Sequence, residues 1–241
     1  MSAPGRGAPA AADAVFDAYA EDYEDALQRG VGLSGEDSAF FARGRVAWVA
    51  RRLAELGVRV KHLLDFGCGT GSTTPLLLEL LGATHVVGTD ASSKLLEVAR
   101  SRYGSARVEF LPLGEPPDGT IDLAYCNGVF HHIPPNQRTE AAQYVWRALR
   151  PGGLFAFWEN NPWNPGTRVV MRRIPFDRDA IKLSPREARG LLRAAGFEIL
   201  RTDFLFLFPR ALAALRRVEP ALASLPLGAQ YLVLARRPAS T

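Results

Sequence analysis

The chain has 241 residues, a formal net charge of +4, an apolar content of 47% and a mean hydropathy of −0.03. This length suits one α/β domain with its own core, and no apolar run is long enough to cross a bilayer, so composition excludes a membrane-spanning protein. Two cysteines, Cys68 and Cys126, fit a reduced, cytosolic protein rather than a disulfide scaffold. Four scattered histidines, without C-x-x-C or H-E-x-x-H, predict no metal site.

The first part of the chain predicts a tail followed by helices. Residues 1–12 are rich in Ala, Pro and Gly and lack an apolar h-region, so we expect a disordered tail and no signal peptide. Residues 16–23 form an amphipathic segment, and residues 29–38, with three glycines, predict a mobile loop. A helix is expected over residues 40–56, ended by a glycine.

Residues 61–90 then predict one right-handed βαβ unit. A short apolar strand leads through Asp65 into a turn with Gly67, Gly69 and Gly71, a leucine-rich helix follows, and the next strand ends at Asp90. The glycines permit a sharp turn and let a ligand approach the backbone, and an acidic residue at that strand end can bind a ribose diol. The unit therefore indicates a site for a nucleoside-containing cofactor.

The glycine spacing selects among cofactors. The order is G-x-G-x-G, with Ser72 where a dinucleotide fingerprint would carry its third glycine, and no Gly-Lys-Ser/Thr of a phosphate loop follows. The D-x-G-x-G-x-G form resembles motif I of the class I S-adenosylmethionine (SAM)-dependent methyltransferases, of the small-molecule branch. A nicotinamide or flavin site, or a tight turn that binds nothing, remains the alternative from these residues.

The next elements follow the same alternation. We expect a helix over residues 93–103 capped by Ser92, strands over 108–113 and 121–126, a helix over 138–149 and a strand over 154–158. The H-H-I-P stretch after the fourth strand and the P-G-G turn before the fifth also resemble the methyltransferase family. The resemblance implies a single domain over residues 13–241, with a helical cap over 13–57.

The last third predicts an insertion and the closing strands. Residues 159–183 read as an irregular or weakly helical insertion over the substrate side, and Ser184 starts a helix that runs to about residue 195. Strands over 198–208 and 230–236 enclose a helix over 210–224. The predicted fold class is α/β: a doubly wound, mostly parallel seven-stranded sheet with the last strand antiparallel, an N-terminal helical lid and a small insertion after strand five.

The resemblance also implies which residues hold the cofactor. They are Tyr23 over the methionine end, the turn and the residues at the following strand ends: Asp65, Gly67, Cys68, Gly69, Thr70, Gly71, Asp90, Ala91, Ser92, Leu113, Gly114, Asn127 and Gly128. Tyr23 is equally well explained as an aromatic packed on the sheet. The family often has an acidic residue after the third strand for adenine, and here Leu113-Gly114 stands there with Glu115 one step later, so the mode of adenine recognition stays open.

Methyl transfer from a sulfonium needs alignment, exclusion of water and, for some acceptors, removal of a proton. The candidate bases are His131 or His132, after strand four, and Glu159, at the end of strand five. The pair of His131 and Glu159 is similar to the His/Glu pair of polyketide C-methyltransferases. One of the two adjacent histidines is expected to point away, and Glu159 is alternatively a turn cap.

The acceptor is left open by these motifs. The first hypothesis is a small molecule methylated on oxygen, nitrogen or activated carbon, giving S-adenosylhomocysteine as the other product. From Arg168 onward the chain has 14 basic and 6 acidic residues, which motivates an RNA or protein methyltransferase as the alternative, with a non-catalytic SAM-fold scaffold as the third. No RNA-binding module is recognisable, so nucleic acid is disfavoured. Residues 205–227 allow contact with a membrane surface or a lipid-linked substrate, and a monomer or homodimer is expected.

Overall fold

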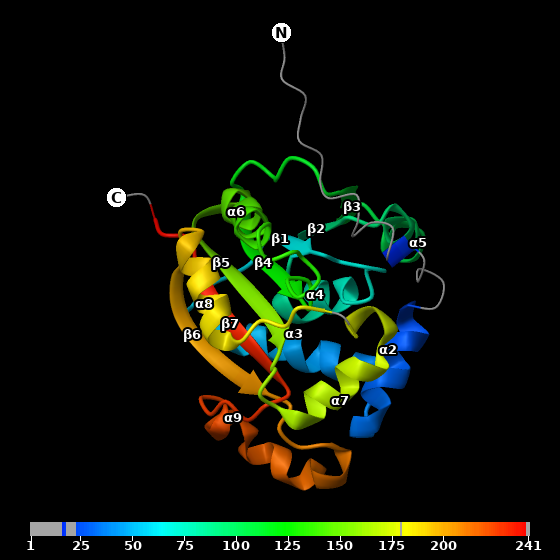
Figure 1. Ribbon diagram of the computed structural model, residues 1–241. Coiled ribbons are helices and arrows are strands. Elements are labelled where there is room, and N and C mark those ends of the chain that lie inside the picture. The colour runs from blue at the N-terminus through cyan, green and yellow to red at the C-terminus, as the bar shows by residue number, and fades with distance from the viewer. Residues whose placement is uncertain (1–15, 18–22, 179, 240–241) are drawn as a thin grey trace.

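A mixed seven-stranded sheet forms the centre of the protein in a computed structural model, which describes residues 16–17, 23–178 and 180–239 (Figure 1). The strand order is β3-β2-β1-β4-β5-β7-β6, and β7 runs antiparallel to both of its neighbours. This confirms the predicted fold class. The strands are β1 (His62–Phe66), β2 (His85–Asp90), β3 (Val108–Pro112), β4 (Ile121–Asn127), β5 (Leu149–Asn160), β6 (Glu198–Leu205) and β7 (Gln230–Arg236).

Helices cover both faces of this sheet (Figure 1). Side chains of α3, α4 and α5 join the buried cluster on one face, and those of α6 and α8 join the cluster on the other. The described helices are α2 (Tyr23–Val31), η1 (Gly32–Ser34), α3 (Ser38–Glu55), α4 (Thr74–Leu81), α5 (Ser93–Tyr103), α6 (Arg138–Ala148), α7 (Pro165–Arg173), η2 (Pro175–Asp177), α8 (Pro185–Ala194), η3 (Arg210–Val218) and α9 (Glu219–Leu222).

The two-sided cover explains why the central strands read as continuous apolar runs. In β1, Leu63 belongs to the cluster under α3 and Leu64 to the cluster under α6, and both are fully buried. In β4, Leu123 and Ala124 divide in the same way. Because successive side chains of a strand point to opposite faces, a strand covered on both sides must be apolar at consecutive positions.

A buried polar contact fixes α3 across the sheet. The Asp203 carboxylate on β6 accepts hydrogen bonds from Arg52 Nε at 2.8 Å and Trp48 Nε1 at 2.9 Å. Before Trp48 and Arg52 on the same helix, Arg45 Nη1 donates to Gln230 Oε1 at 3.0 Å, at the start of β7. The helix that precedes the glycine turn is therefore held in register with the far strands of the sheet.

Local end signals predicted several boundaries correctly. Ser92 Oγ accepts from Leu95 N at the start of α5, and Ser184 and Glu187 form the reciprocal capping box of α8. The last strand, β7, has the predicted bounds, Gln230–Arg236. The insertion after β5 is more regular than expected, because Asn164 caps a nine-residue α7.

Two predictions about local structure were wrong. Residues 29–38 are not a loop: α2 continues to Val31 and η1 follows, with Gly35 in the left-handed region at φ 80°. The single helix predicted over 210–224 is the 3₁₀ helix η3 followed by the short α9. Pro220 stands in the first turn of α9, and a proline ring disrupts the turn before it, so one continuous α-helix is disfavoured.

Some expectations fall where the structure gives no description. The tail over residues 1–12, and residues 18–22 of the amphipathic segment, lie outside the described residues. None of the helices that are described combines the length and the apolar character needed to cross a membrane.

Candidate functional site

The turn after β1 requires glycine at its first and third glycine positions. Gly67, Gly69 and Gly71 have φ values of 72°, 55° and 75°, which side chains rarely adopt. A Cβ on Gly67 would lie 2.3 Å from Val129 Cγ2, and one on Gly71 would lie 2.8 Å from Phe110 Cζ. The turn is therefore packed against its neighbours at both ends.

Gly69, in the middle of the turn, has an open side. A Cβ there would meet only the Tyr23 ring, at 3.9 Å, among the described residues. Tyr23 in turn stacks on Phe176 of η2, with ring centroids 4.9 Å apart and an interplanar angle of 11°. Burial raises the pKa of Tyr23 well above its usual value, so the hydroxyl stays protonated. Tyr23 thus lies beside the turn and connects α2 to the insertion, and its position over the methionine end of SAM stays a prediction.

Asp90, at the end of β2, lies directly beside this turn. Its Oδ2 accepts from Gly69 N at 2.9 Å, and its Oδ1 accepts from Ser92 N at 2.9 Å. Burial and the charge of Asp90 raise the pKa of Asp65, on β1, to about 7. Two carboxyl groups therefore flank the turn, in the positions that the sequence assigned to them.

The N-terminal segment is attached to this edge by two side-chain contacts. Thr70 Oγ1 donates to Glu24 Oε1 at 2.9 Å, and Ser92 Oγ donates to Asp17 Oδ1 at 2.5 Å. The remaining predicted cofactor residues, Ala91, Leu113, Gly114, Asn127 and Gly128, follow the ends of β2, β3 and β4, and Cys68 lies in the turn. All of them lie at the carboxyl edge of the parallel strands, where ligands of open α/β sheets bind.

Glu159 and His131 form a buried pair at the same edge. Glu159 Oε2 lies 2.6 Å from His131 Nδ1, and Oε1 accepts from the backbone N–H groups of Phe130 and His131 at 2.9 and 3.3 Å. Both side chains are almost fully buried. Glu159 therefore caps the turn after β4, as the alternative prediction had it, and also orients the His131 ring, while its catalytic role stays a prediction.

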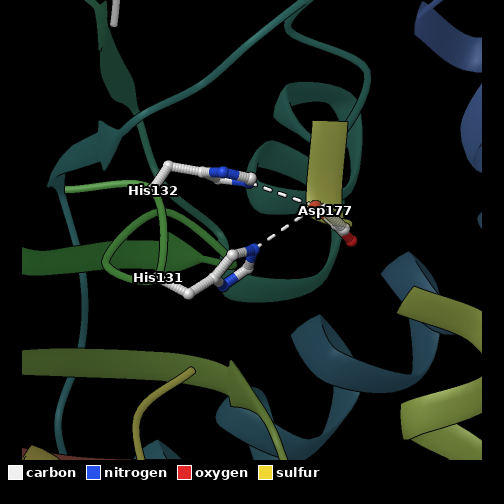
Figure 2. Close-up of side chains that lie close together, drawn as sticks. All are labelled: His131, His132 and Asp177. Carbon is white, nitrogen blue, oxygen red and sulfur yellow. Dashed lines mark hydrogen bonds and ion pairs between the residues drawn. The ribbon is translucent and has the colours of Figure 1, made fainter. Parts of the chain in front are cut away.

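Asp177, which the sequence analysis did not identify, completes a cluster with both histidines. Its Oδ1 lies 3.4 Å from His131 Nε2 and 3.2 Å from His132 Nε2. Figure 2 shows both imidazole rings directed at this carboxylate. The expectation that one of the two histidines points away was wrong. The reason is the turn after β4, where His132 N donates to Val129 O at 3.0 Å and brings both side chains to one side.

The charges of this cluster follow from its geometry. Burial opposes a charge on His131, but the carboxylates of Glu159 and Asp177 outweigh it and raise the pKa of His131 to about 10. Burial likewise opposes ionisation of Asp177, but hydrogen bonds from His131 and His132 lower its pKa to about 2. Burial and the charge on His131 lower the pKa of His132. At neutral pH, His131 therefore carries a proton between two carboxylates, and His132 is neutral.

A cavity of about 460 Å³ adjoins the cluster. Its wall comes from α2, α3, α7, η2, the turn after β4 and the segment after β6. The polar residues of this lining include Arg45, Asn127, His131, His132 and Asp177, with Glu36, Asn160, Asn164, Arg216 and Gln230 also among them, and the apolar wall includes Leu27, Phe40, Phe41, Val170, Ile174 and Phe206.

Two polar groups in the cavity lining lack the partners that burial normally demands. Arg45 is 8% exposed and donates to Tyr125 Oη at 3.3 Å and to Gln230, but no carboxylate among the described residues forms an ion pair with it. Asn127 Oδ1 is buried and has no hydrogen-bond partner within the described ranges. Buried charges and polar atoms are ordinarily paired, so both groups are suited to a ligand.

Arg45 was missed although the sequence carries a signal for it. It shares a buried face of α3 with Val49 and Arg52, at helical spacing, so an arginine stands where an apolar residue is expected. Asp177 has no such signal, because an Asp in an arginine-rich insertion reads as a surface residue until the fold brings it to His131.

Comparison with known proteins assigns the family. Residues 63–153 match the family model of a methyltransferase domain. A trans-aconitate 2-methyltransferase of Rhizobium rhizogenes is 33% identical over 180 residues, which cover 67% of this chain and 68% of that protein. O-methyltransferase cnsE of Penicillium expansum is 32% identical over 169 residues, covering 62% of this chain and 58% of cnsE.

Other matches are shorter or show the fold alone. A trans-aconitate 2-methyltransferase of Variovorax paradoxus is 32% identical over 115 residues, 47% of this chain, and the match spans about half of that relative, 44% of its length. A SAM-dependent methyltransferase of Thermotoga maritima, described as a possible histamine N-methyltransferase, has a TM-score of 0.65 at 17% identity and covers 94% of this chain and 99% of its own. With the glycine turn, Asp90 and the 3-2-1-4-5-7-6 sheet in place, the chain belongs to the class I SAM-dependent methyltransferases, with small-molecule methyltransferases among its relatives.

Proposed function

We propose that this protein transfers the methyl group of SAM to an oxygen atom of an apolar small molecule that binds in the 460 Å³ cavity. The observation that carries the proposal is a pair of polar groups in the cavity lining: Arg45 forms no ion pair with a carboxylate, and Asn127 Oδ1 has no hydrogen-bond partner, among the described residues. Relatives named as an O-methyltransferase and as trans-aconitate 2-methyltransferases favour a small acceptor methylated on oxygen.

The residues present fit the cofactor in three respects. The Arg45 guanidinium, without a carboxylate partner among the described residues, suits the methionine carboxylate, and Asn127 Oδ1 suits the ammonium group as acceptor. The open side of Gly69 leaves room for the methionine chain under Tyr23. Asp90 is placed to accept hydrogen bonds from a ribose diol, as its position after β2 predicts.

The apolar wall suggests the acceptor's character. Phe40, Phe41 and Phe206 lie in edge contact with one another along the cavity, with ring centroids 4.9–6.1 Å apart. Such walls bind apolar molecules through area, while a few polar groups fix the orientation. We therefore expect an acceptor with an apolar or aromatic body whose oxygen points to the histidine cluster.

The chain's own contribution is alignment and exclusion of water. When bound, SAM supplies an electrophilic methyl group, so alignment of the acceptor can contribute roughly 7–11 kcal/mol. Tyr23 lies beside Gly69 and stacks on Phe176 of η2, so aromatic rings from two different elements are available to shield the bound methyl group from water. Glu159 acts as a positioning residue through His131, and the role of either histidine as a base stays a prediction. One domain over residues 13–241 remains part of the proposal.

Calorimetry with SAM, followed by transfer of a labelled methyl group to a panel of carboxylic acids, phenols and amines, tests the proposal. A hydrogen-bonded charge contributes about 1.5–3 kcal/mol, so Arg45→Met is expected to weaken SAM binding roughly tenfold to a hundredfold. Arg43→Met, which alters an exposed pair on the same helix, is the matched control and should leave affinity unchanged. A wild-type protein that does not bind SAM would overturn the proposal, and labelled amines alone would overturn its assignment to oxygen.

A further inference from the structure

The histidine cluster has the spacing of a metal site. His131, His132 and Asp177 each offer one ligand atom, a ring nitrogen or a carboxylate oxygen, and these three atoms lie within 4.8 Å of one another. Asp177 Oδ1 is 3.4 Å from the first nitrogen and 3.2 Å from the second, long for charge-assisted hydrogen bonds, which are about 2.7–2.9 Å. Ligand atoms at opposite ends of a tetrahedral edge around Zn²⁺ are roughly 3.3 Å apart, given bonds of about 2.0–2.1 Å.

A second, independent feature points the same way. The Nδ1 atom of His131 lies 2.6 Å from Glu159 Oε2, and the other Glu159 oxygen is fixed by two backbone N–H groups. An anchored carboxylate on Nδ1 fixes the direction of Nε2, which is the usual support of metal-binding histidines, and an ion that binds there displaces the Nε2 proton that His131 otherwise carries at neutral pH. The His131 side chain is 2% exposed, the His132 side chain 15% and the Asp177 side chain 7%, so the ligand atoms are sheltered from bulk water.

We propose that His131 Nε2, His132 Nε2 and Asp177 Oδ1 bind a divalent transition-metal ion of the Zn²⁺ class. Two imidazoles and one carboxylate suit such an ion, and three protein ligands leave a further coordination position open. All three residues line the cavity, so the open position faces the acceptor. The sequence analysis predicted no metal because the third ligand comes from η2, 45 positions after His132 along the chain.

The metal's task rests on the proposed methyl transfer to oxygen. An acceptor hydroxyl, enol or carboxylic acid bound at the open position loses its proton to solvent, since coordination lowers the pKa of the bound oxygen. The oxygen then attacks the methyl carbon, the carbon–sulfur electron pair stays on sulfur, and S-adenosylhomocysteine and the methylated product result. In this proposal the ion takes the place of the separate general base that His131 or His132 would otherwise provide.

Titration calorimetry of the chelator-treated full chain with Zn²⁺, and the visible absorption of bound Co²⁺, test the site. We expect one ion per chain and a tetrahedral Co²⁺ spectrum in wild type, and no stoichiometric binding in His132→Gln or Asp177→Asn. Glu159→Gln should keep one ion per chain but weaken its affinity roughly tenfold to a hundredfold, as loss of a histidine's carboxylate partner does. Circular dichroism identifies any variant that fails to fold, and His132→Gln, the most exposed of the changes, retains the test if Asp177→Asn is lost.

The remaining two histidines provide the control. His62 and His85 lie on neighbouring strands with ring centroids 5.6 Å apart, away from the cavity. The double variant His62→Gln/His85→Gln should bind the ion as wild type does. Loss of binding in that variant, unchanged binding in His132→Gln and Asp177→Asn, or no stoichiometric binding by wild type would each overturn the site.

Failure of the metal inference is distinguishable from failure of the proposed function. SAM binding and methyl transfer that proceed unchanged after chelation would overturn the metal site and leave the methyltransferase proposal standing. One bound ion per chain without SAM binding would overturn the methyltransferase proposal and leave the metal site standing. If both hold, methyl transfer should fall at least tenfold on chelation and return with added Zn²⁺.

Discussion

Asp65 is a buried acid beside the glycine turn, and the effect of its burial on the pKa can be tested with a single substitution. Its pKa of about 7 in the folded chain compares with 3.8 for an ordinary Asp, because burial and Asp90 disfavour the charge. Folding therefore binds an extra proton between these two values, so this group makes the protein less stable as pH rises from about 4 to 7, and the loss is complete above its folded pKa.

Asp65→Asn should remove this pH dependence. Relative to wild type, the variant is expected to gain about 1.4 kcal/mol of unfolding free energy for each pH unit between 5 and about 6.5, and to level off above pH 7. Urea unfolding at pH 5, 6, 7 and 8 measures it, with Asp118→Asn in an exposed loop as the control for the chemical change. A difference between Asp65→Asn and wild type that is the same at all four pH values would contradict the burial argument.

The sequence analysis found residues whose partners lie nearby along the chain, and it missed a residue whose partners lie far away. Gly67, Gly69 and Asp90 sit within one βαβ unit, whose local pattern fixes their relation. Asp177 meets His131 only after the insertion folds back over β4, and no periodicity encodes that contact. Arg45 was detectable in principle, because a charge on the buried face of a helix is locally visible.

At the level of elements, the helix–strand alternation was predictable and the irregular segments were not. Capping residues and apolar runs locate α5, α8 and β7 because these signals act within a few residues. The segment over residues 210–218 follows a 3₁₀ path, and its leucines at 212 and 215 are about half exposed, so packing supplied no periodic signal. The prediction of one α-helix over residues 210–224 rested on short-range propensity alone.

The attachment of α3 to β6 is the element contact whose loss should be most costly. Asp203 is 1% exposed and holds Arg52 and Trp48, with Arg201 Nη2 also 3.0 Å away. Removing one partner of a buried ion pair costs about 3–5 kcal/mol, and because Arg52 keeps its ion pair with Glu55 Oε2 at 2.6 Å, the lower end of this range is expected. Asp203→Ala is therefore expected to lower the urea midpoint strongly.

An exposed ion pair between the same helix and α4 provides the comparison for that prediction. Arg43 and Glu79 form an exposed contact at 3.3 Å, and exposed pairs contribute about 0–1 kcal/mol. Glu79→Ala should therefore change the unfolding free energy by less than about 1 kcal/mol under the same conditions. Equal losses in Asp203→Ala and Glu79→Ala would show that Arg52 finds another partner.

Across the whole molecule, the binding surface separates into two parts. In the proposed function, the turn after β1 and the ends of β2 to β4 supply the cofactor side, whereas α2, α3, α7 and the segment after β6 wall the cavity. The number of strands and the antiparallel last strand came from the resemblance to the family, and the strand order was not predicted, because local sequence patterns do not encode strand pairing between distant segments. The cavity was beyond sequence reasoning, because its walls come from four separate parts of the chain.

This separation predicts that acceptor binding can be blocked without harming the cofactor side. Val170 on α7 is half-buried and lines the cavity, so a tryptophan there fills space that the acceptor needs. Val170→Trp should reduce methyl transfer, or binding of an apolar dye, at least tenfold while the dissociation constant for SAM stays within about twofold, because Arg45, Asn127 and the turn are untouched. Val218→Trp, on exposed η3 and outside the cavity wall, should change neither quantity. Equal loss of SAM binding and methyl transfer in Val170→Trp, with the fold intact by circular dichroism, would mean that the cavity belongs to the cofactor and that the acceptor binds elsewhere.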